Sequence, residues 1–228
     1  MKERVLSLDL IKIFAMIGVV SLHTTLGLES YDNIFSRYLY SLGGWAIPLF
    51  FTTSGFLQIG RTIDFKYILK KTLRIFRIIV FVAIIYWLKD GGDAVSLVKD
   101  YIFLSLFQKG PVGHFWFFGA IIICYAATPF FNNIMKKPWG TELCLIILFL
   151  LMSFAFVANV KDNFESNVIQ TFRLWNWLFY YCLGGYIRQN SEQIKAFFKT
   201  DYKWKTISRP ILFILLGGGH FIRYSFRI

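Results

Sequence analysis

Three ionisable side chains interrupt the first apolar run of the chain, LDLIKIFAMIGVVSLH at residues 8–23. Asp9 stands one helical turn before Lys12 and is therefore close enough to pair with it. In a helix, the interval from Lys12 to His23 covers about three turns with a remainder of about 20°, which places both side chains on one face. The same interval separates them by about 16 Å along the helix axis.

Ionisable groups within a membrane span cost a few kcal/mol each and usually face a bundle interior or a water-filled cavity. His23 is suited to general-base chemistry, because the ordinary pKa of histidine lies near neutral pH. The competing interpretation is purely structural: Asp9 and Lys12 lie near the interface, where Lys12 snorkels to water, and His23 is a packing residue. Both interpretations remain open for this segment.

The composition is that of a membrane protein. The chain of 228 residues is 56% hydrophobic and 20% aromatic but only 17% charged, against about 25% charged in a soluble domain. The net charge of +12 does not indicate nucleic-acid binding, because the positive residues form short clusters between apolar segments. Cys124, Cys144 and Cys182 lie in apolar runs without metal-ligand spacing, so we expect apolar fillers and no metal site.

The apolar runs predict an all-α transmembrane bundle, with residues 1–228 as a single integral-membrane domain. A span requires about 20 apolar residues. An N-terminal signal peptide is disfavoured, because Asp9 and Lys12 interrupt its apolar region and no clear cleavage site follows. The six expected spans and a partial seventh are Leu8–Leu28, Tyr38–Ile59, Ile75–Leu88, Phe115–Phe131, Leu143–Val160, Phe172–Ile187 and Ile211–Ile222.

The charges of the connecting segments predict that the N-terminus is cytoplasmic. With that orientation the inside segments are rich in lysine and arginine, as the positive-inside rule requires. These inside residues are Lys2, Arg4, Arg61, Lys66, Lys70, Lys71, Arg74, Arg77, Lys136, Lys137, Arg188, Lys195, Lys199, Lys203, Lys205 and Arg209. The outside segments hold fewer: Arg37, Lys89, Lys99, Lys109, Lys161 and Arg173.

Several motifs occur in a characteristic order after the Lys12–His23 pair: FFTTSGFL at 50–57, KKTLRIF at 70–76, HFWFFGAIIICYAATPFF at 114–131 and YYCLGGYI at 180–187. Together they resemble acyltransferase family 3, bacterial integral-membrane proteins that include O-acetyltransferases of cell-surface polysaccharides. In that family an arginine stands at the position of Lys12, and many members have a proline where this chain has Arg77.

The resemblance implies an enzyme of the bacterial plasma membrane. It would transfer an acyl group, in the first instance acetyl, from cytoplasmic acetyl-CoA to a hydroxyl of a cell-surface polysaccharide or its lipid-linked precursor. The implied catalytic residues are His23, as general base or acyl carrier, and Lys12, as counter-charge to the coenzyme's phosphates. The implied substrate-binding residues are Asp9, Ser54, Arg74, His114 and Trp116.

Alternatives accompany several of these roles. For Ser54 we favour close helix packing with Gly55 over a nucleophile, because SGF lacks the nucleophile-elbow context. Arg74 is preferred within the basic segment, although topology alone explains most of that segment. His114 either orients the acceptor or packs at the interface with Trp116.

The chain covers roughly two thirds of a usual family member, so we expect it to be incomplete at its C-terminus. A glycan or small-molecule transporter and an inactive remnant of the enzyme are the competing functions. The expected partners are membrane lipid, acyl-CoA and a surface glycan or lipid-linked sugar, and no nucleic acid. The sequence identifies neither the acceptor sugar, nor the acyl chain, nor the oligomeric state.

Overall fold

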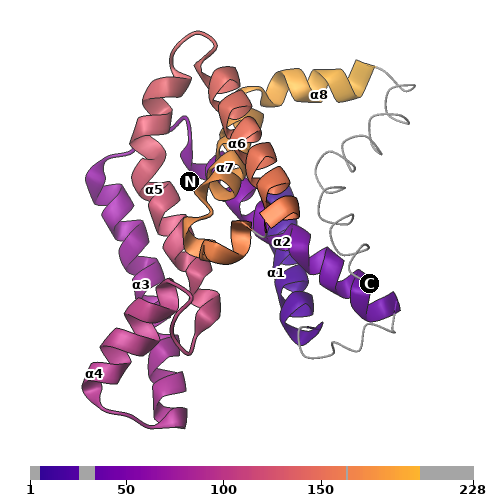
Figure 1. Cartoon of the computed structure of the whole chain (residues 1–228). Coiled ribbons are helices and arrows are strands. Elements are labelled where there is room, and N and C mark those ends of the chain that lie inside the picture. Colours follow the sequence, from indigo (N-terminus) through magenta and orange to yellow (C-terminus); the bar gives the residue numbers. More distant parts are fainter. Residues whose placement is uncertain (1–5, 26–33, 163, 201–228) are drawn as a thin grey trace. The chain divides into compact units, whose positions relative to one another are not determined.

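The structure, a computed structural model, describes residues 6–25, 34–162 and 164–200, and every regular element in these ranges is helical. The predicted all-α fold is therefore confirmed. Each of the six predicted spans overlaps a helix in Figure 1, although the third helix begins ten residues before the predicted Ile75. These helices are α1 (Leu6–Thr25), α2 (Ile34–Gln58), α3 (Phe65–Asp90), α5 (Trp116–Met135), α6 (Gly140–Asp162) and α7 (Leu174–Gln189), and α8 (Ser191–Thr200) follows them.

Three stretches of the described residues are long and apolar enough to cross a membrane: Leu6–Thr24, Gly113–Met135 and Gly140–Lys161. They correspond to α1, α5 and α6. The count of six spans and the cytoplasmic N-terminus remain predictions. The partial seventh span, Ile211–Ile222, lies outside the described residues.

The chain divides into two compact units. The first unit comprises residues 1–54 and 186–228 and includes α1 and most of α2. These two helices approach closely at Gly43, where a Cβ atom would lie 2.5 Å from the Cβ of Leu22 and 2.8 Å from the carbonyl oxygen of Gly18. Such small residues allow membrane helices to come together without an intervening side chain.

The second unit comprises residues 55–185 and includes α3, α5, α6 and most of α7. Asp64 caps the N-terminus of α3, because its side chain accepts a hydrogen bond of 2.8 Å from the backbone N–H of Tyr67. The helix ends at Gly91, whose positive φ of 76° suits glycine. One apolar cluster of this unit joins α3 to residues 101–102 and to the turn that precedes α5, and it consists of Ile79, Ala83, Tyr101, Ile102, Val112 and Phe115.

The connection from α3 to α5 contains a helical hairpin that we did not predict. Its two arms are the end of α3 and a second helical segment, in which the single turn α4 (Ala94–Ser96) continues directly into η1 (Leu97–Leu104), which has the hydrogen bonding of a π-helix. The second segment folds back along the end of α3 (Figure 1), and its Tyr101 donates a hydrogen bond of 3.1 Å to the carboxylate of Asp90. Short apolar runs broken by charges, such as LVKDYIFL, carry little periodicity from which to predict such an element.

Candidate functional site

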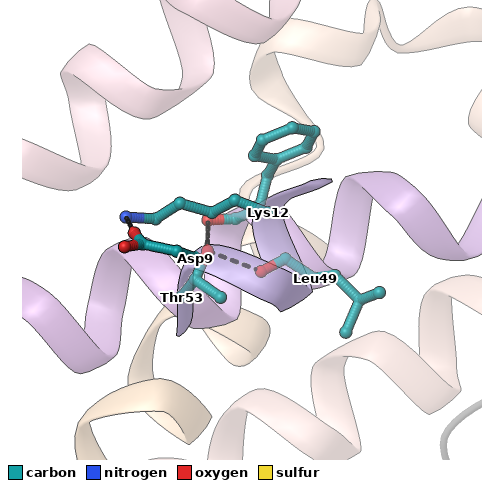
Figure 2. A network of polar contacts seen from close by, with 5 residues as sticks. Asp9, Lys12, Leu49 and Thr53 are labelled. Carbon is teal, nitrogen blue, oxygen red and sulfur yellow. Dashed lines mark hydrogen bonds and ion pairs between the residues drawn. The ribbon is translucent and has the colours of Figure 1, made fainter. Parts of the chain in front are cut away.

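The predicted ion pair in α1 is present. The Nζ atom of Lys12 lies 3.9 Å from Oδ1 of Asp9, and the side chains are 40% and 28% exposed respectively (Figure 2). This separation is too long for a hydrogen bond, so the pair is a loose electrostatic contact. Figure 2 also shows Thr53 of α2, whose hydroxyl donates to the carbonyl oxygens of Leu49 at 2.9 Å and Phe50 at 3.1 Å.

His23 occupies the last turn of α1 and is exposed. Because α1 is an unbroken helix from Leu6 to Thr25, Lys12 and His23 share one face at a separation of about 16 Å along the axis. Ser54 is half-buried in α2 and is the last residue of the first unit's N-terminal segment. Asp9, Lys12, His23 and Ser54 thus belong to the same unit.

Arg74, His114 and Trp116 belong to the second unit. Trp116 is buried at the beginning of α5 and stacks on Trp177 of α7, with ring centroids 5.1 Å apart. His114 is exposed and contacts the rings of Phe115 at 5.5 Å and Tyr86 at 6.3 Å, in edge-on arrangements. The geometry therefore gives Trp116 a packing contact, whereas His114 is accessible.

The basic segment of α3 contains a cation that is held by aromatic rings. The Nζ atom of Lys71 lies 5.4 Å from the ring centroid of Tyr67 and 5.1 Å from that of Tyr125. Both distances are within the range of cation–π attraction. Arg61 and Arg74 are close enough to interact electrostatically with Lys71, so three cationic groups lie near one another.

Within this cationic group, formed by Arg61, Lys71 and Arg74, Lys71 is the member that contacts a ring of α5. Tyr125, which contacts Lys71, lies about ten residues before the end of α5 at Met135, or about 15 Å along the axis. The ammonium group of Lys71 therefore lies beside a tyrosine in the middle of a candidate membrane span, Gly113–Met135. Arg74, the residue preferred from sequence, is exposed, whereas Lys71, which was not singled out, is half-buried. Tyr67, one helical turn before Lys71, was the only local signal.

Asn132 of α5 fixes the backbone beside the cationic group. Its Oδ1 accepts a hydrogen bond of 2.9 Å from the N–H of Gly60, and its Nδ2 donates one of 2.9 Å to the carbonyl oxygen of Arg61. An asparagine amide that satisfies both a donor and an acceptor of one turn holds that turn in a single conformation. The turn between α2 and α3 is therefore ordered by α5.

Further polar side chains are buried between α5 and α7. The hydroxyl groups of Thr128 and Tyr181 lie 2.8 Å apart and share a hydrogen bond, and both residues are buried. In the same unit, the Oε1 atom of Gln58 is buried without a hydrogen-bond partner among the described residues. Buried polar groups at membrane depth are costly, and they commonly mark a functional interior.

Close packing is observed in the SGF motif. A Cβ atom on Gly55 would lie 1.8 Å from the carbonyl oxygen of Tyr181, so the backbones of α2 and α7 are in direct contact there. The cysteines of the described residues are also in packed positions: Cys124, Cys144 and Cys182 are buried and free.

The apolar helices, with an ion pair and a histidine in the first of them, define a helical membrane protein. The family model for an acyltransferase domain, Acyl_transf_3, matches residues 5–227. The chain therefore belongs to acyltransferase family 3, as its motifs predict. No curated protein and no solved structure gives a significant match to the chain.

Proposed function

We propose that this protein is a membrane-bound O-acyltransferase. It would take an acyl group, in the first instance acetyl, from cytoplasmic acyl-CoA and transfer it to a hydroxyl of a cell-surface polysaccharide or its lipid-linked precursor. The observation that carries the proposal is family membership over nearly the whole chain. The continuous helix that bears Lys12 and His23 on one face supports it.

The cationic group fits the donor. Acyl-CoA carries several phosphate groups, and lysine and arginine bind phosphate through charge-assisted hydrogen bonds. Arg61, Lys71 and Arg74 supply three positive charges, and Tyr67 and Tyr125 hold the central one in place. Because Lys71 is half-buried and contacts Tyr125 in the middle of α5, a phosphate of the donor would enter the protein to reach it.

His23 supplies the chemistry in this proposal. Its neutral imidazole accepts the proton of the acceptor hydroxyl as the oxygen attacks the thioester carbonyl. The carbon–sulfur bond then breaks, and the thiolate of coenzyme A takes the proton from the imidazolium. Lys12, held loosely by Asp9, offers a positive charge to an anionic part of the donor.

Replacement of His23 tests the proposal. We expect His23→Ala to abolish O-acyl esters on the surface glycan, measured as acetate released by mild alkali, while glycan export stays normal. Thr24→Ala is the matched control, because Thr24 is exposed in the same turn and its hydroxyl contacts only carbonyl groups of its own helix, those of Val20 and Ser21. It should leave the ester content unchanged.

A transporter is the competing function, because polar groups inside a membrane bundle also line permeation paths. Loss of glycan export with normal acylation in the His23→Ala strain would favour transport and overturn the proposal. Normal export together with normal acylation would show that His23 has no part in either activity.

A further inference from the structure

The backbone at Gln108 is strained. The helical segment that follows η1 ends in a Schellman arrangement, in which Lys109 N–H donates to the carbonyl oxygen of Leu104 at 2.8 Å and Gln108 N–H donates to that of Ser105 at 3.1 Å. This arrangement places Gln108 in the left-handed region, with φ of 59°. Glycine is the usual residue there, because a side chain is disfavoured in that conformation.

The side chain of Gln108 explains why glycine is not used. Its Oε1 accepts a hydrogen bond of 3.1 Å from the backbone N–H of Gln170 in η4 (Gln170–Phe172). The strained residue thus ties the turn after η1 to the segment that precedes α7. A backbone conformation that is unfavourable locally, but is held by a contact with a distant segment, is typical of functional sites.

A second contact holds these two segments together: the hydroxyl of Thr171 donates to the carbonyl oxygen of Leu106 at 2.6 Å. The segment of η4 is also fixed to α7, because the indole N–H of Trp177 donates to the carbonyl oxygen of Gln170 at 2.6 Å. Both segments rest on Gly119 of α5, where a Cβ atom would lie 2.9 Å from the oxygen of Leu106 and 2.9 Å from Cγ2 of Thr171. The surface built from the two segments is therefore rigid.

Two aromatic rings are presented on this rigid surface. Phe107 lies between Leu106 and Gln108, and Phe172 follows Thr171. Each phenylalanine is therefore next in the chain to a residue that forms a hydrogen bond between the two segments. Their centroids are 5.6 Å apart with an angle of 32° between the planes, and the residues are 37% and 45% exposed. We name this pair, together with the amide of Gln108, the Phe107–Phe172 platform.

We propose that the Phe107–Phe172 platform binds the glycan chain of the acceptor. Sugar rings have apolar C–H faces that stack on aromatic rings, while their hydroxyls bond to amides such as that of Gln108. The platform lies near the beginning of α5, the end that the charge pattern places outside, where His114 is exposed. This inference rests on the proposed function and names the binding surface for its acceptor.

A glycan fits these observations better than lipid. Fluid acyl chains have no fixed geometry, so rigidity from a strained glutamine and hydrogen bonds between segments would not improve contact with lipid. A ligand with defined stereochemistry binds more tightly to a rigid surface, because a preformed site loses less conformational entropy on binding. The rings also project from turns and not from the apolar face of a spanning helix.

The test replaces both rings by leucine, which keeps their apolar character but removes the aromatic faces. The double variant Phe107→Leu/Phe172→Leu is purified into lipid nanodiscs and assayed with radiolabelled acetyl-CoA. The acceptor is the host's surface polysaccharide after removal of its esters with mild alkali. We expect the KM for polysaccharide to rise about tenfold, with kcat and the KM for acetyl-CoA unchanged. Phe107→Tyr/Phe172→Tyr should retain a low KM.

Phe154→Leu is the control, because Phe154 is 70% exposed on α6, a candidate span, and should face lipid. It should behave as wild type. An unchanged KM for polysaccharide in the double leucine variant would show that the rings contact only lipid and would overturn the inference.

If the wild type transfers no acetyl, the proposed function fails. Direct binding of the same polysaccharide to the protein in nanodiscs then tests whether the platform binds glycan. Equal binding by wild type and the double leucine variant overturns the inference, and weaker binding by the variant supports it.

Discussion

Gly55→Ala should strongly destabilise the protein, because the glycine lies directly on the backbone of α7. A Cβ atom there would be 1.8 Å from the carbonyl oxygen, 2.7 Å from the carbonyl carbon and 3.0 Å from the Cα atom of Tyr181. Ordinary contacts begin near 3.4 Å, so the two segments would have to separate by roughly 1.6 Å, the difference between these distances. The obstructing atoms are backbone and cannot rotate away.

Overpacking typically costs 1–3 kcal/mol, and an immobile neighbour places this case at the upper end, so we expect a loss of about 3 kcal/mol. For a chain of this size, that loss corresponds to a fall in Tm of roughly 6–12 °C. The assay is thermal unfolding of the purified protein in detergent, followed by tryptophan fluorescence. The temperature at which native monodisperse protein is lost provides a second readout.

Gly44→Ala is the matched control, since Gly44 lies in the same helix and a Cβ atom there would meet no atom within 4 Å. Alanine favours helix over glycine by roughly 0.5–1 kcal/mol, so the Tm of this variant should equal or exceed that of wild type. A Gly55→Ala protein that melts within about 2 °C of wild type would refute the close contact between Gly55 and Tyr181.

Three further predictions concern the second unit. A double-mutant cycle of Thr128→Val and Tyr181→Phe should show a coupling of about 1 kcal/mol in unfolding free energy, because the two hydroxyls share a hydrogen bond; additive effects would contradict the bond. Lys71→Met should raise the KM for acyl-CoA more than Lys71→Arg does, because methionine retains the packing but loses the charge; equal KM values would remove Lys71 from the donor site. The backbone N–H of Ser96, followed by its side chain, holds the pKa of the Asp93 carboxyl below its ordinary value. The cap should therefore protect the Ser96 amide from hydrogen exchange at neutral pH and lose this protection as the pH falls through the lowered pKa, whereas Asp93→Ala should show weak protection throughout.

The helices themselves could be predicted from the sequence. Long apolar runs bury backbone hydrogen bonds only as helices, so the six predicted spans overlap α1, α2, α3, α5, α6 and α7. The pairing of Asp9 with Lys12 followed from helical spacing for the same reason. Family membership also followed, because the order of short motifs is a property of the sequence.

The environment of individual side chains could not be predicted in the same way. Trp116 is buried against Trp177, far along the chain, and local spacing gives no indication of that partner. Within the basic segment, Arg74 and Lys71 look equivalent in sequence, but only Lys71 meets the ring of Tyr125. The choice between them depends on how α3 and α5 are aligned, which local spacing does not encode.

The sequence by itself determined that this is a helical membrane protein of acyltransferase family 3, with Lys12 and His23 on one face of its first helix. These properties depend on hydrophobicity, helical period and motif order, all of which are local. Only the tertiary structure decided which cation is held by aromatic rings, that the connection from α3 to α5 is a helical hairpin, and that Phe107 and Phe172 form one surface. Those features arise from contacts between distant segments, and a strained residue such as Gln108 is recognised only when its partner, Gln170, is in place.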